Sequence, residues 1–355
     1  MDFLKPNPEL YNVPFIANEF NGMPYQLLGQ SGLRVSNVGL GTWKMGLPKT
    51  GDGARVDEKT AYQIFDRAIE LGVTFWDTAN RYNGASGNSE RLIGRWLAKN
   101  PGQRRNIVIA TKCFGGMDGI TPNHSRLSRT NILESVYASL ERLQVDCLDL
   151  LYFHRFDGDA PIHESMSAVE DLVSRDMIRY FAVSNVTVNQ LHQYMAAENH
   201  FSCRCRITAV QNYFEILSRE KQDAEGVLDY CAQKKISFVA YSPLAGGLLT
   251  DRYLDPSSVS SGDRLVDEGR LKEAASPEVM EKLKALNRVA GDADLSLSQL
   301  CLAYMLTLPG MGPLIPSAST VKQLESNAAA GKVTLTDEQK TAVKTILNEN
   351  PRETD

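Results

Sequence analysis

Leu148-Asp-Leu-Leu-Tyr-Phe153 is an apolar run, and His154 follows it directly. The run has the length and composition of a buried strand, and it lies between two segments with helical spacing, at 130–143 and 164–174. The same order of strand and helix recurs on both sides of it. Strands that alternate with helices predict a parallel sheet, because parallel neighbours need a crossover connection.

Outward from this run, we predict eight strands and ten helices. The strands cover residues 38–42, 73–77, 107–111, 148–153, 179–183, 207–211, 236–241 and 311–315. The helices cover residues 58–71, 89–99, 130–143, 164–174, 187–199, 223–234, 277–290, 298–307, 321–330 and 337–348. This order predicts an α/β fold, a (β/α)8 TIM barrel with extra C-terminal helices. A doubly wound open sheet is the alternative, but it would carry a glycine-rich fingerprint after an early strand, which is absent.

Three segments lie outside the alternation. Residues 25–28 and 33–36 flank a glycine-containing turn, which predicts a hairpin that closes the N-terminal mouth of the barrel. Residues 1–24 are rich in Pro and Asn and predict an irregular arm, and residues 250–275 predict a long polar loop. We therefore expect one barrel domain over residues 25–355, preceded by the arm.

Composition excludes several classes of protein. The 355 residues are 43% hydrophobic and 23% charged, as in ordinary globular proteins, and the formal net charge of -5 argues against nucleic-acid binding. We expect no membrane partner, because no apolar stretch approaches the ~20 residues of a spanning helix. The N-terminus lacks a secretory signal, so a cytoplasmic location is expected. Cys203 and Cys205 form an isolated pair, and no metal site is predicted.

Four polar side chains follow successive predicted strands. Asp77 ends the second strand and Tyr82 comes five residues later, while Lys112 and His154 follow the third and fourth strands. Because α/β barrels place their chemistry at the C-terminal rim, we expect the four to meet there. Singly they have simpler explanations: a turn-forming aspartate, a loop aromatic, a surface lysine and a core histidine.

Together the four suit proton transfer to a carbonyl. Tyr82 can donate the proton if a cation lowers its pKa, and Lys112 could supply that cation. Asp77 could hold Lys112 in place through a charge-assisted hydrogen bond. His154 could orient the carbonyl oxygen or help to deliver the proton. Run backward, the same set deprotonates an alcohol.

The order and spacing of the motifs resemble the aldo-keto reductases over roughly residues 25–330. The resemblance implies a (β/α)8 barrel that binds a nicotinamide cofactor without a Rossmann domain. It also implies Tyr82 as general acid, tuned by Lys112 and Asp77, and His154 as carbonyl orienter. The motifs that carry it are Gly39-Leu-Gly-Thr-Trp43, Asp77-Thr-Ala-Asn-Arg-Tyr82, Ser89-Glu90, Thr111-Lys112, Leu151-Tyr-Phe-His154-Arg-Phe-Asp157, Val183-Ser-Asn185, Val210-Gln-Asn212, Tyr241-Ser-Pro-Leu244, Ile315-Pro316, Gln323-Leu324 and Asn327.

The resemblance also implies cofactor contacts. Ser184, Asn185 and Gln211 would bind the carboxamide, since amide side chains offer both donor and acceptor. Tyr241 would stack on the nicotinamide ring, and the glycine-rich segment after it would bring N–H groups to the pyrophosphate. The other expected contacts are Gly41, Thr42, Trp43, Asp77, Ser242, Pro243, Leu244, Gly246, Gly247, Leu248, Ile315, Ser317, Ser319, Gln323 and Asn327.

The sequence specifies the cofactor preference and the substrate less closely than it specifies the fold. Lys322 is the only cation in the segment expected to meet a ribose 2'-phosphate, but serines and helix N–H groups also bind phosphate. NADP(H) is therefore predicted, with NAD(H) as the alternative. The expected substrate is a small carbonyl or alcohol, in a pocket lined by Trp43, Phe114, Phe153 and Arg155.

Three functions fit these observations. The first is an NADP(H)-dependent reductase of an aldehyde or ketone. The second is an NAD(P)-dependent sugar or polyol dehydrogenase, which uses the same residues in reverse. The third is a nucleotide-sensing regulatory subunit of a membrane channel, with little turnover. The oligomeric state is left open.

Overall fold

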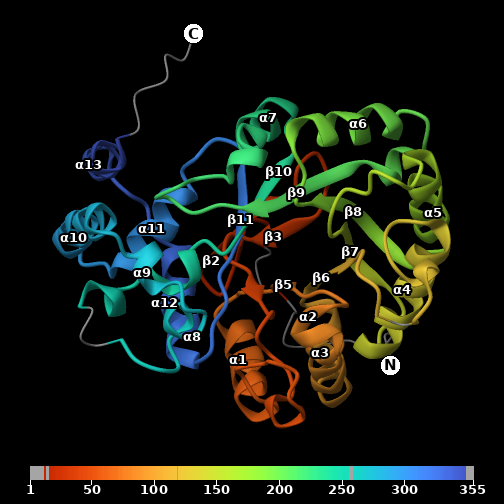
Figure 1. The fold of residues 1–355 in the computed structure, drawn as a ribbon, viewed down its shortest axis with the longest axis horizontal. Helices are drawn as coiled ribbons and strands as arrows, with labels where there is room; N and C mark the ends of the chain where they lie inside the picture. Colours follow the sequence, from red (N-terminus) through yellow and green to blue (C-terminus); the bar gives the residue numbers. More distant parts are fainter. Residues whose placement is uncertain (1–11, 13–15, 118, 256–258, 349–355) are drawn as a thin grey trace.

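Eight parallel strands form one sheet (Figure 1), and they are β4 (Leu40–Gly41), β5 (Phe75–Asp77), β6 (Val108–Cys113), β7 (Leu148–Phe153), β8 (Ile178–Ser184), β9 (Ile207–Tyr213), β10 (Ser237–Tyr241) and β11 (Met311–Ile315), in this spatial order. The computed structural model describes residues 12, 16–117, 119–255 and 259–348. The sheet closes on itself, because Val38 pairs in parallel with Leu314 and Gly41 with Ser317. The predicted (β/α)8 barrel is confirmed.

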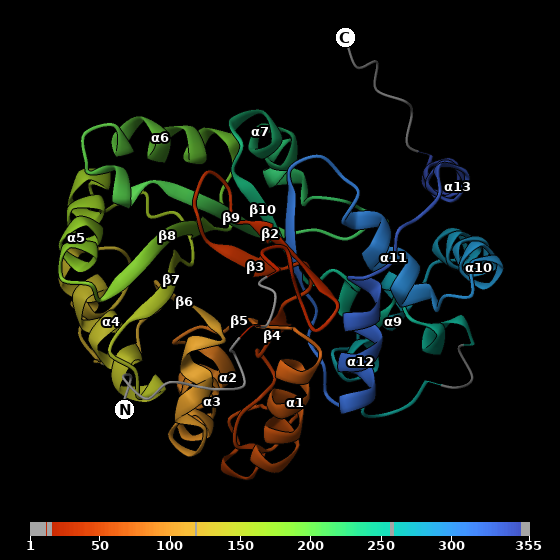
Figure 2. The same cartoon turned by 180° about the vertical axis from the view of Figure 1, so that it is seen from behind.

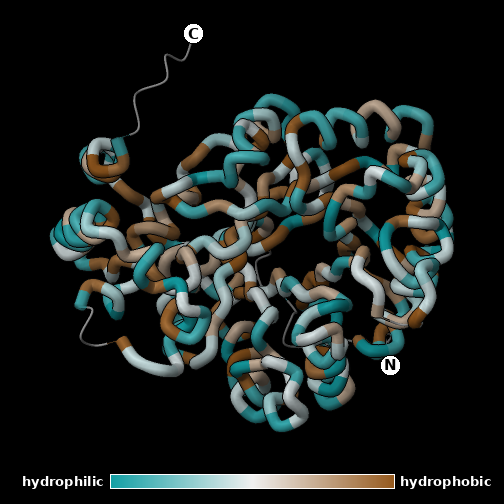
Figure 3. Tube along the Cα trace, in the orientation of Figure 1, coloured by the Kyte–Doolittle hydropathy of each residue, from teal (hydrophilic) through white to brown (hydrophobic). Residues whose placement is uncertain are grey.

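Helices surround the strands, as predicted. They are α1 (Glu58–Glu70), α3 (Asn88–Lys99), α4 (Arg129–Leu143), α5 (Ile162–Ser174), α6 (Val188–Glu198), α7 (Val227–Lys234), α10 (Pro277–Asp292), α11 (Leu297–Met305), α12 (Val321–Ala330) and α13 (Asp337–Leu347). Their hydrophilic and hydrophobic residues are interspersed (Figure 3), as expected for helices with one buried face. In α1, for example, Ala61, Ile64, Phe65 and Ala68 are buried at spacings of three, one and three residues. Among the described residues, no helix combines the length and apolar character needed to cross a bilayer.

The predicted hairpin closes the N-terminal mouth of the barrel (Figure 2). It is built from β2 (Met23–Leu27) and β3 (Arg34–Ser36), which pair antiparallel. Leu28 and Val35 of this hairpin are fully buried in the inner core of the barrel. With this mouth filled, the opposite rim is left to bind ligands.

The predicted irregular arm was wrong in its last residues. A short strand, β1 (Glu19–Phe20), pairs antiparallel with β2, which itself begins at Met23. The pairing depends on a partner strand and not on local composition, so the Pro- and Asn-rich sequence did not indicate it. Residues 1–11 and 13–15 of the arm lie outside the described residues.

The segment predicted as one long polar loop, 250–275, is partly helical. It contains a 3-10 helix, η8 (Asp251–Leu254), and two short helices, α8 (Arg264–Asp267) and α9 (Leu271–Ala274). Tyr253 and Leu265 are buried, and the Leu265 N–H donates to the Tyr253 hydroxyl over 3.4 Å. These two apolar anchors hold a segment whose average composition is polar.

Two apolar cores build the barrel. The inner core joins the hairpin to inward-facing strand residues such as Phe75, Leu150 and Tyr152. The outer core fills the space between the strands and the helices, and Phe153 belongs to it. Neighbouring residues of a strand point to opposite faces, which is why Tyr152 lies inside the barrel and Phe153 outside it.

Candidate active site

The four predicted proton-transfer residues meet at the C-terminal rim of the barrel. Asp77 is the last residue of β5, and Tyr82 begins the short helix α2 (Tyr82–Ala85). Lys112 lies in β6, and His154 comes directly after β7. Parallel pairing of β5, β6 and β7 brings these strand ends side by side, as expected. The Tyr82 and His154 rings lie 6.1 Å apart, edge to face.

The Lys112 ammonium is the centre of this cluster. It donates to Asp77 Oδ1 and Oδ2 over 2.6 and 2.8 Å, to the Thr78 carbonyl over 2.8 Å and to the Tyr82 hydroxyl over 2.9 Å. Asp77 also accepts from Gln211 Nε2 over 2.7 Å and from the Tyr82 hydroxyl over 3.3 Å. Lys112 is only 1% exposed, so these bonds replace the water that a buried ammonium loses.

Tyr82 is held in its protonated form. Burial raises its pKa well above the usual value of 10, and the Asp77 carboxylate raises it further. Lys112, 2.9 Å from the hydroxyl, favours the phenolate, but burial and Asp77 outweigh it and the net direction of the pKa is upward. Burial lowers the pKa of Lys112 while Asp77 opposes that effect. The cluster thus presents a phenol, which is a proton donor.

His154 is neutral at physiological pH. Burial is the main cause that lowers its pKa to about 3, and the positive charges of Lys112 and Arg155 add to it. A neutral imidazole can donate a hydrogen bond to a carbonyl oxygen but carries no proton to give away readily. Of the two roles expected for His154, orienting the carbonyl fits this protonation state.

The low pKa of His154 predicts a loss of stability in acid. The unfolded chain binds a proton at His154 below about pH 6.5 and the folded chain does not, so the free energy of unfolding falls as pH falls, by roughly 1.4 kcal/mol per pH unit at most. We expect His154→Gln to lose less stability than the wild type between pH 7 and 4 in urea unfolding. His192→Gln, on the exposed face of α6, is the control. Equal losses in wild type and His154→Gln would contradict the prediction.

The residues expected at the nicotinamide form one hydrogen-bonded group. Ser184 Oγ donates to the Gln211 carbonyl over 2.7 Å, and Asn185 Nδ2 donates to the His154 carbonyl over 2.9 Å. The Tyr241 hydroxyl donates to Asn185 Oδ1 over 2.8 Å. Gln211 also reaches Asp77, so the predicted carboxamide site and the proton-transfer cluster share one network.

The residues expected at the pyrophosphate and ribose lie on two further segments. Gly246 and Gly247 have positive φ values of 71° and 108°, which glycine adopts without strain and which leave the backbone open to close approach. At the start of α12, the Ser319 N–H and hydroxyl both donate to Gln323 Oε1 over 2.8 Å. Asn327 Nδ2 donates to the carbonyl of Ser317, which lies beside Gly41.

Sequence reasoning missed two cations beside this site. The Arg264 guanidinium lies 4.5 Å from the Trp43 ring centre, and Lys44 Nζ lies 4.1 Å from it. A Cβ added at Gly246 would lie 3.8 Å from Arg264 Nε, so Arg264 also borders the glycine segment. Arg264 comes from the segment predicted as a polar loop, and no local pattern pointed to it. Amide partners at one end and glycines with cations at the other fit a dinucleotide with anionic phosphates.

The predicted substrate pocket needs one correction. Phe153 is fully buried and packs against Phe181 at a ring distance of 4.7 Å, on the outer side of the barrel. It therefore does not line a pocket at the rim. Phe114 packs partly against the same outer core, whereas Arg155 is exposed next to His154.

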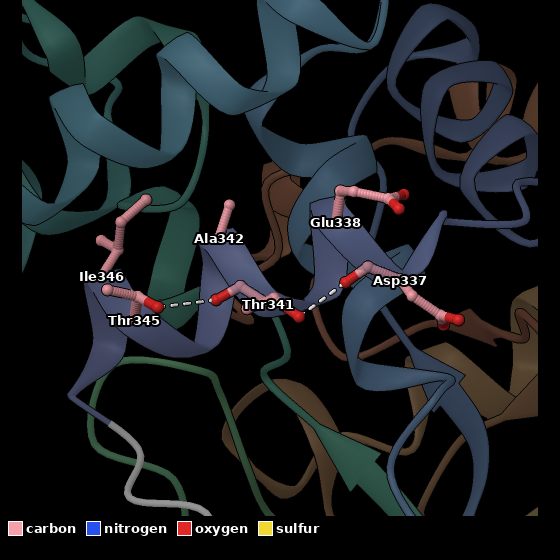
Figure 4. A pocket seen from close by; sticks show the side chains of 6 residues that line it. All are labelled: Asp337, Glu338, Thr341, Ala342, Thr345 and Ile346. Atoms are coloured by element: carbon pink, nitrogen blue, oxygen red, sulfur yellow. Dashed lines mark hydrogen bonds between the residues drawn. The ribbon is translucent and has the colours of Figure 1, made fainter.

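Two surface hollows are lined by residues outside the four-residue cluster. One runs along α13 and is lined by residues 337–346 of that helix alone (Figure 4). The Thr341 and Thr345 hydroxyls there bond back to carbonyls of their own helix. The other lies among Tyr253, Leu271 and Met280, beside the start of α10. Neither hollow contains any residue of the four-residue cluster.

The fold and site define a class of protein that comparison with known families identifies. A family model described as the aldo/keto reductase family matches residues 37–348, and the chain belongs to this family. It is an oxidoreductase that acts on carbonyl groups.

Individual relatives are similar over most of their length. Aldo-keto reductase str7 of Strobilurus tenacellus is 31% identical over 333 residues, which cover 92% of this chain and 93% of str7. The NADP(+) aldo-keto reductase yakc of Schizosaccharomyces pombe is 33% identical over 79% of this chain and 80% of its own. A probable voltage-gated potassium channel subunit beta of Arabidopsis thaliana is 31% identical over 87% of this chain and 91% of its own.

Proposed function

We propose that this protein is an NADP(H)-dependent reductase that converts an aldehyde or ketone to the alcohol. The observation that carries the proposal is the contact of Lys112 with both Asp77 and the Tyr82 hydroxyl at the open rim. A buried ammonium that bonds a protonated phenol is suited to proton donation, because it can stabilise the phenolate left behind.

The residues divide the work as follows. The group around Asn185 and Gln211 would hold the cofactor, which would supply the hydride to the carbonyl carbon. Neutral His154 orients the carbonyl oxygen toward Tyr82, which gives its proton to that oxygen. Lys112, 2.9 Å from the phenolic oxygen, then stabilises the negative charge on Tyr82. Asp77 keeps Lys112 aimed at this atom throughout.

Protonated Tyr82 is the form that begins carbonyl reduction. Oxidation of a sugar or polyol would need Tyr82 as a phenolate, and burial and Asp77 both raise its pKa. The dehydrogenase alternative uses the same residues and begins from the phenolate, so the substrate screen below decides between the two. The substrate remains a small-molecule carbonyl, and a cytoplasmic location stays a prediction of the sequence.

We infer NADP(H) from the charged and polar groups near the cofactor segments. Arg264 lies beside Gly246 and Trp43, and Lys44 lies beside Trp43. Arg binds phosphate through paired donors, so these cations suit the pyrophosphate that both cofactors carry, while the serines and helix N–H groups at the start of α12 would meet the 2'-phosphate of NADP(H). The relative named as an NADP(+) enzyme agrees with this choice.

A substrate screen tests the proposal. Purified protein is offered aldehydes and ketones with NADPH and with NADH, and the corresponding alcohols with the oxidised cofactors. We expect carbonyl reduction with a higher kcat/KM for NADPH than for NADH. A preference for NADH of about tenfold, or 1.4 kcal/mol, would overturn the cofactor assignment. Turnover of alcohols alone would favour the dehydrogenase.

The potassium channel relative supports a second candidate, a nucleotide-sensing regulatory subunit. The complete cluster of Asp77, Tyr82, Lys112 and His154 favours an enzyme. Tight NADPH binding without turnover of any carbonyl in the screen would favour the regulator instead.

A further inference from the structure

The first turn of α3 lies directly behind the strand ends that carry Asp77 and Lys112. Ser89 and Glu90 in this turn are both fully buried, and the proposed chemistry uses neither of them. A buried carboxylate is costly unless it is paired, so its position needs a physical explanation. The hydrogen-bond partners of Glu90 and Ser89 connect these two residues to the two strand ends.

Ser89 is tied to Asp77 through a chain of hydroxyls. The Thr42 hydroxyl donates to the Asp77 carbonyl over 2.9 Å, so its only proton is used there. Ser89 Oγ lies 2.7 Å from Thr42 Oγ1, donates to the Thr42 carbonyl over 3.1 Å and accepts from Thr78 Oγ1 over 3.0 Å. The Thr78 carbonyl in turn accepts from Lys112. One buried serine thus links both backbone carbonyls beside the Asp77–Lys112 pair.

Glu90 is tied to Lys112 through the neighbouring residue. The Thr111 hydroxyl donates to Glu90 Oε1 over 2.6 Å, and Arg142 of α4 donates to Glu90 Oε2 over 2.6 Å. Thr111 and Lys112 are adjacent in β6, so their side chains point to opposite faces of the strand. The bond between Thr111 and Glu90 therefore anchors the part of β6 from which Lys112 points inward.

We propose that Ser89 and Glu90 are positioning residues for the proton donor, fixing Asp77 through Thr42 and Lys112 through Thr111. The inference rests on the proposed reductase function. A contact that only held α3 against α4 could be apolar, because replacing a buried ion pair by packed apolar residues is often neutral or stabilising. Glu90 and Arg142 are instead charged and bonded to the strand. The negative charge of Glu90 also helps to keep Lys112 protonated, since it raises the Lys112 pKa.

Thr111→Val is the main test, because it removes the bond to Glu90 at nearly constant volume and leaves the Glu90–Arg142 pair intact. We expect kcat for carbonyl reduction to fall by about tenfold or more, with cofactor KM unchanged, since small displacements of a catalytic group are costly. Thr111→Ser keeps the hydroxyl and should retain most of kcat. Thr208→Val is the matched control, because this buried strand threonine bonds the Phe181 carbonyl at the other end of the barrel.

Ser89→Ala tests the second link with the same readout, and Ser36→Ala is its control. Ser36 is an equally buried serine that bonds a backbone carbonyl near the hairpin. We expect a lower kcat only for Ser89→Ala. Similar thermal stability in each pair shows that the loss does not come from unfolding.

The protonation of Lys112 supplies a readout that needs no turnover. In protein labelled at the lysine Cε, the Lys112 signal is assigned by its absence in Lys112→Met. Thr111→Val should lower the pH at which Lys112 loses its proton, because the bonds that Lys112 donates to Asp77, which favour the charged form, loosen. The titratable groups that act on Lys112 are Asp77 of β5, Tyr82 of α2, Tyr152 of β7, His154 directly after β7, and Glu90 of α3 on the other side of β6.

The outcomes separate this inference from the proposed function. Wild-type kcat and wild-type Lys112 titration in Thr111→Val, or equal loss in Thr111→Ser and Thr111→Val, would overturn the positioning role. An inactive wild type would instead contradict the reductase function, while the Lys112 titration would still decide the positioning role.

Discussion

Replacing Tyr82 with phenylalanine should lower kcat for carbonyl reduction by on the order of 10²–10⁴, the usual contribution of a positioned general acid. The ring stays and only the hydroxyl that Lys112 and Asp77 contact is lost. Cofactor affinity should survive, because Tyr82 is not among the residues expected to bind the nicotinamide. Steady-state kinetics and titration of NADPH fluorescence on the variant measure the two quantities.

Tyr62→Phe is the matched control for this change. The Tyr62 hydroxyl on α1 also bonds a carboxylate, Glu58 Oε1 at 2.8 Å, but it lies outside the rim. This variant should keep wild-type kcat. Full activity in Tyr82→Phe would show that the proton comes from another group, and loss of NADPH binding would show that Tyr82 acts mainly through the cofactor.

Replacing Asp77 with asparagine should damage both stability and activity. The Lys112 ammonium would be left at 1% exposure without a counter-charge, and breaking a buried pair in this way costs about 3–5 kcal/mol. The folded pKa of Lys112 would fall further below that of the unfolded chain. The unfolded state then binds more protons, so the free energy of unfolding of this variant should rise with pH toward 10. Denaturant unfolding from pH 7 to 10 measures it.

The double variant Asp77→Asn with Lys112→Met separates the two effects. Removing the ammonium removes the uncompensated charge, so most of the lost stability should return. Activity should not return, because the group that stabilises the Tyr82 phenolate is gone. An Asp77→Asn single variant with wild-type stability and kcat would contradict the central role of the Asp77–Lys112 pair.

Much of the fold could be predicted because its signals are local. Strands buried on both faces appear as continuous apolar runs, such as 148–153, and the predicted ends lie close to the observed ones. The helices show buried residues at helical spacing, as in α1. The parts that were wrong, β1 and the short helices within 250–275, depend on strand pairing and on a few buried anchors. Neither leaves a periodic pattern in the sequence.

The candidate site was likewise predictable only in part. The order of strands was enough to predict that Asp77, Tyr82, Lys112 and His154 share one rim, because parallel strand ends meet at one edge of a barrel. It was not enough to place Arg264 beside the Trp43 ring, since α8, far along the chain, returns to the barrel there. Nor did it show that Phe153 faces the outer core, because an apolar run has no visible inside and outside.

The protonation of the rim came from folding alone. Tyr82 is a phenol and His154 is neutral because burial removes water from both, and because the Asp77 carboxylate lies beside Tyr82 and the Lys112 ammonium acts on His154 from another strand. The residue types and their order were sufficient for the barrel and for the chemistry it could hold. The protonation of Tyr82 and the position of Lys112 depend on contacts between residues that are distant in the sequence, such as Asp77 and Lys112.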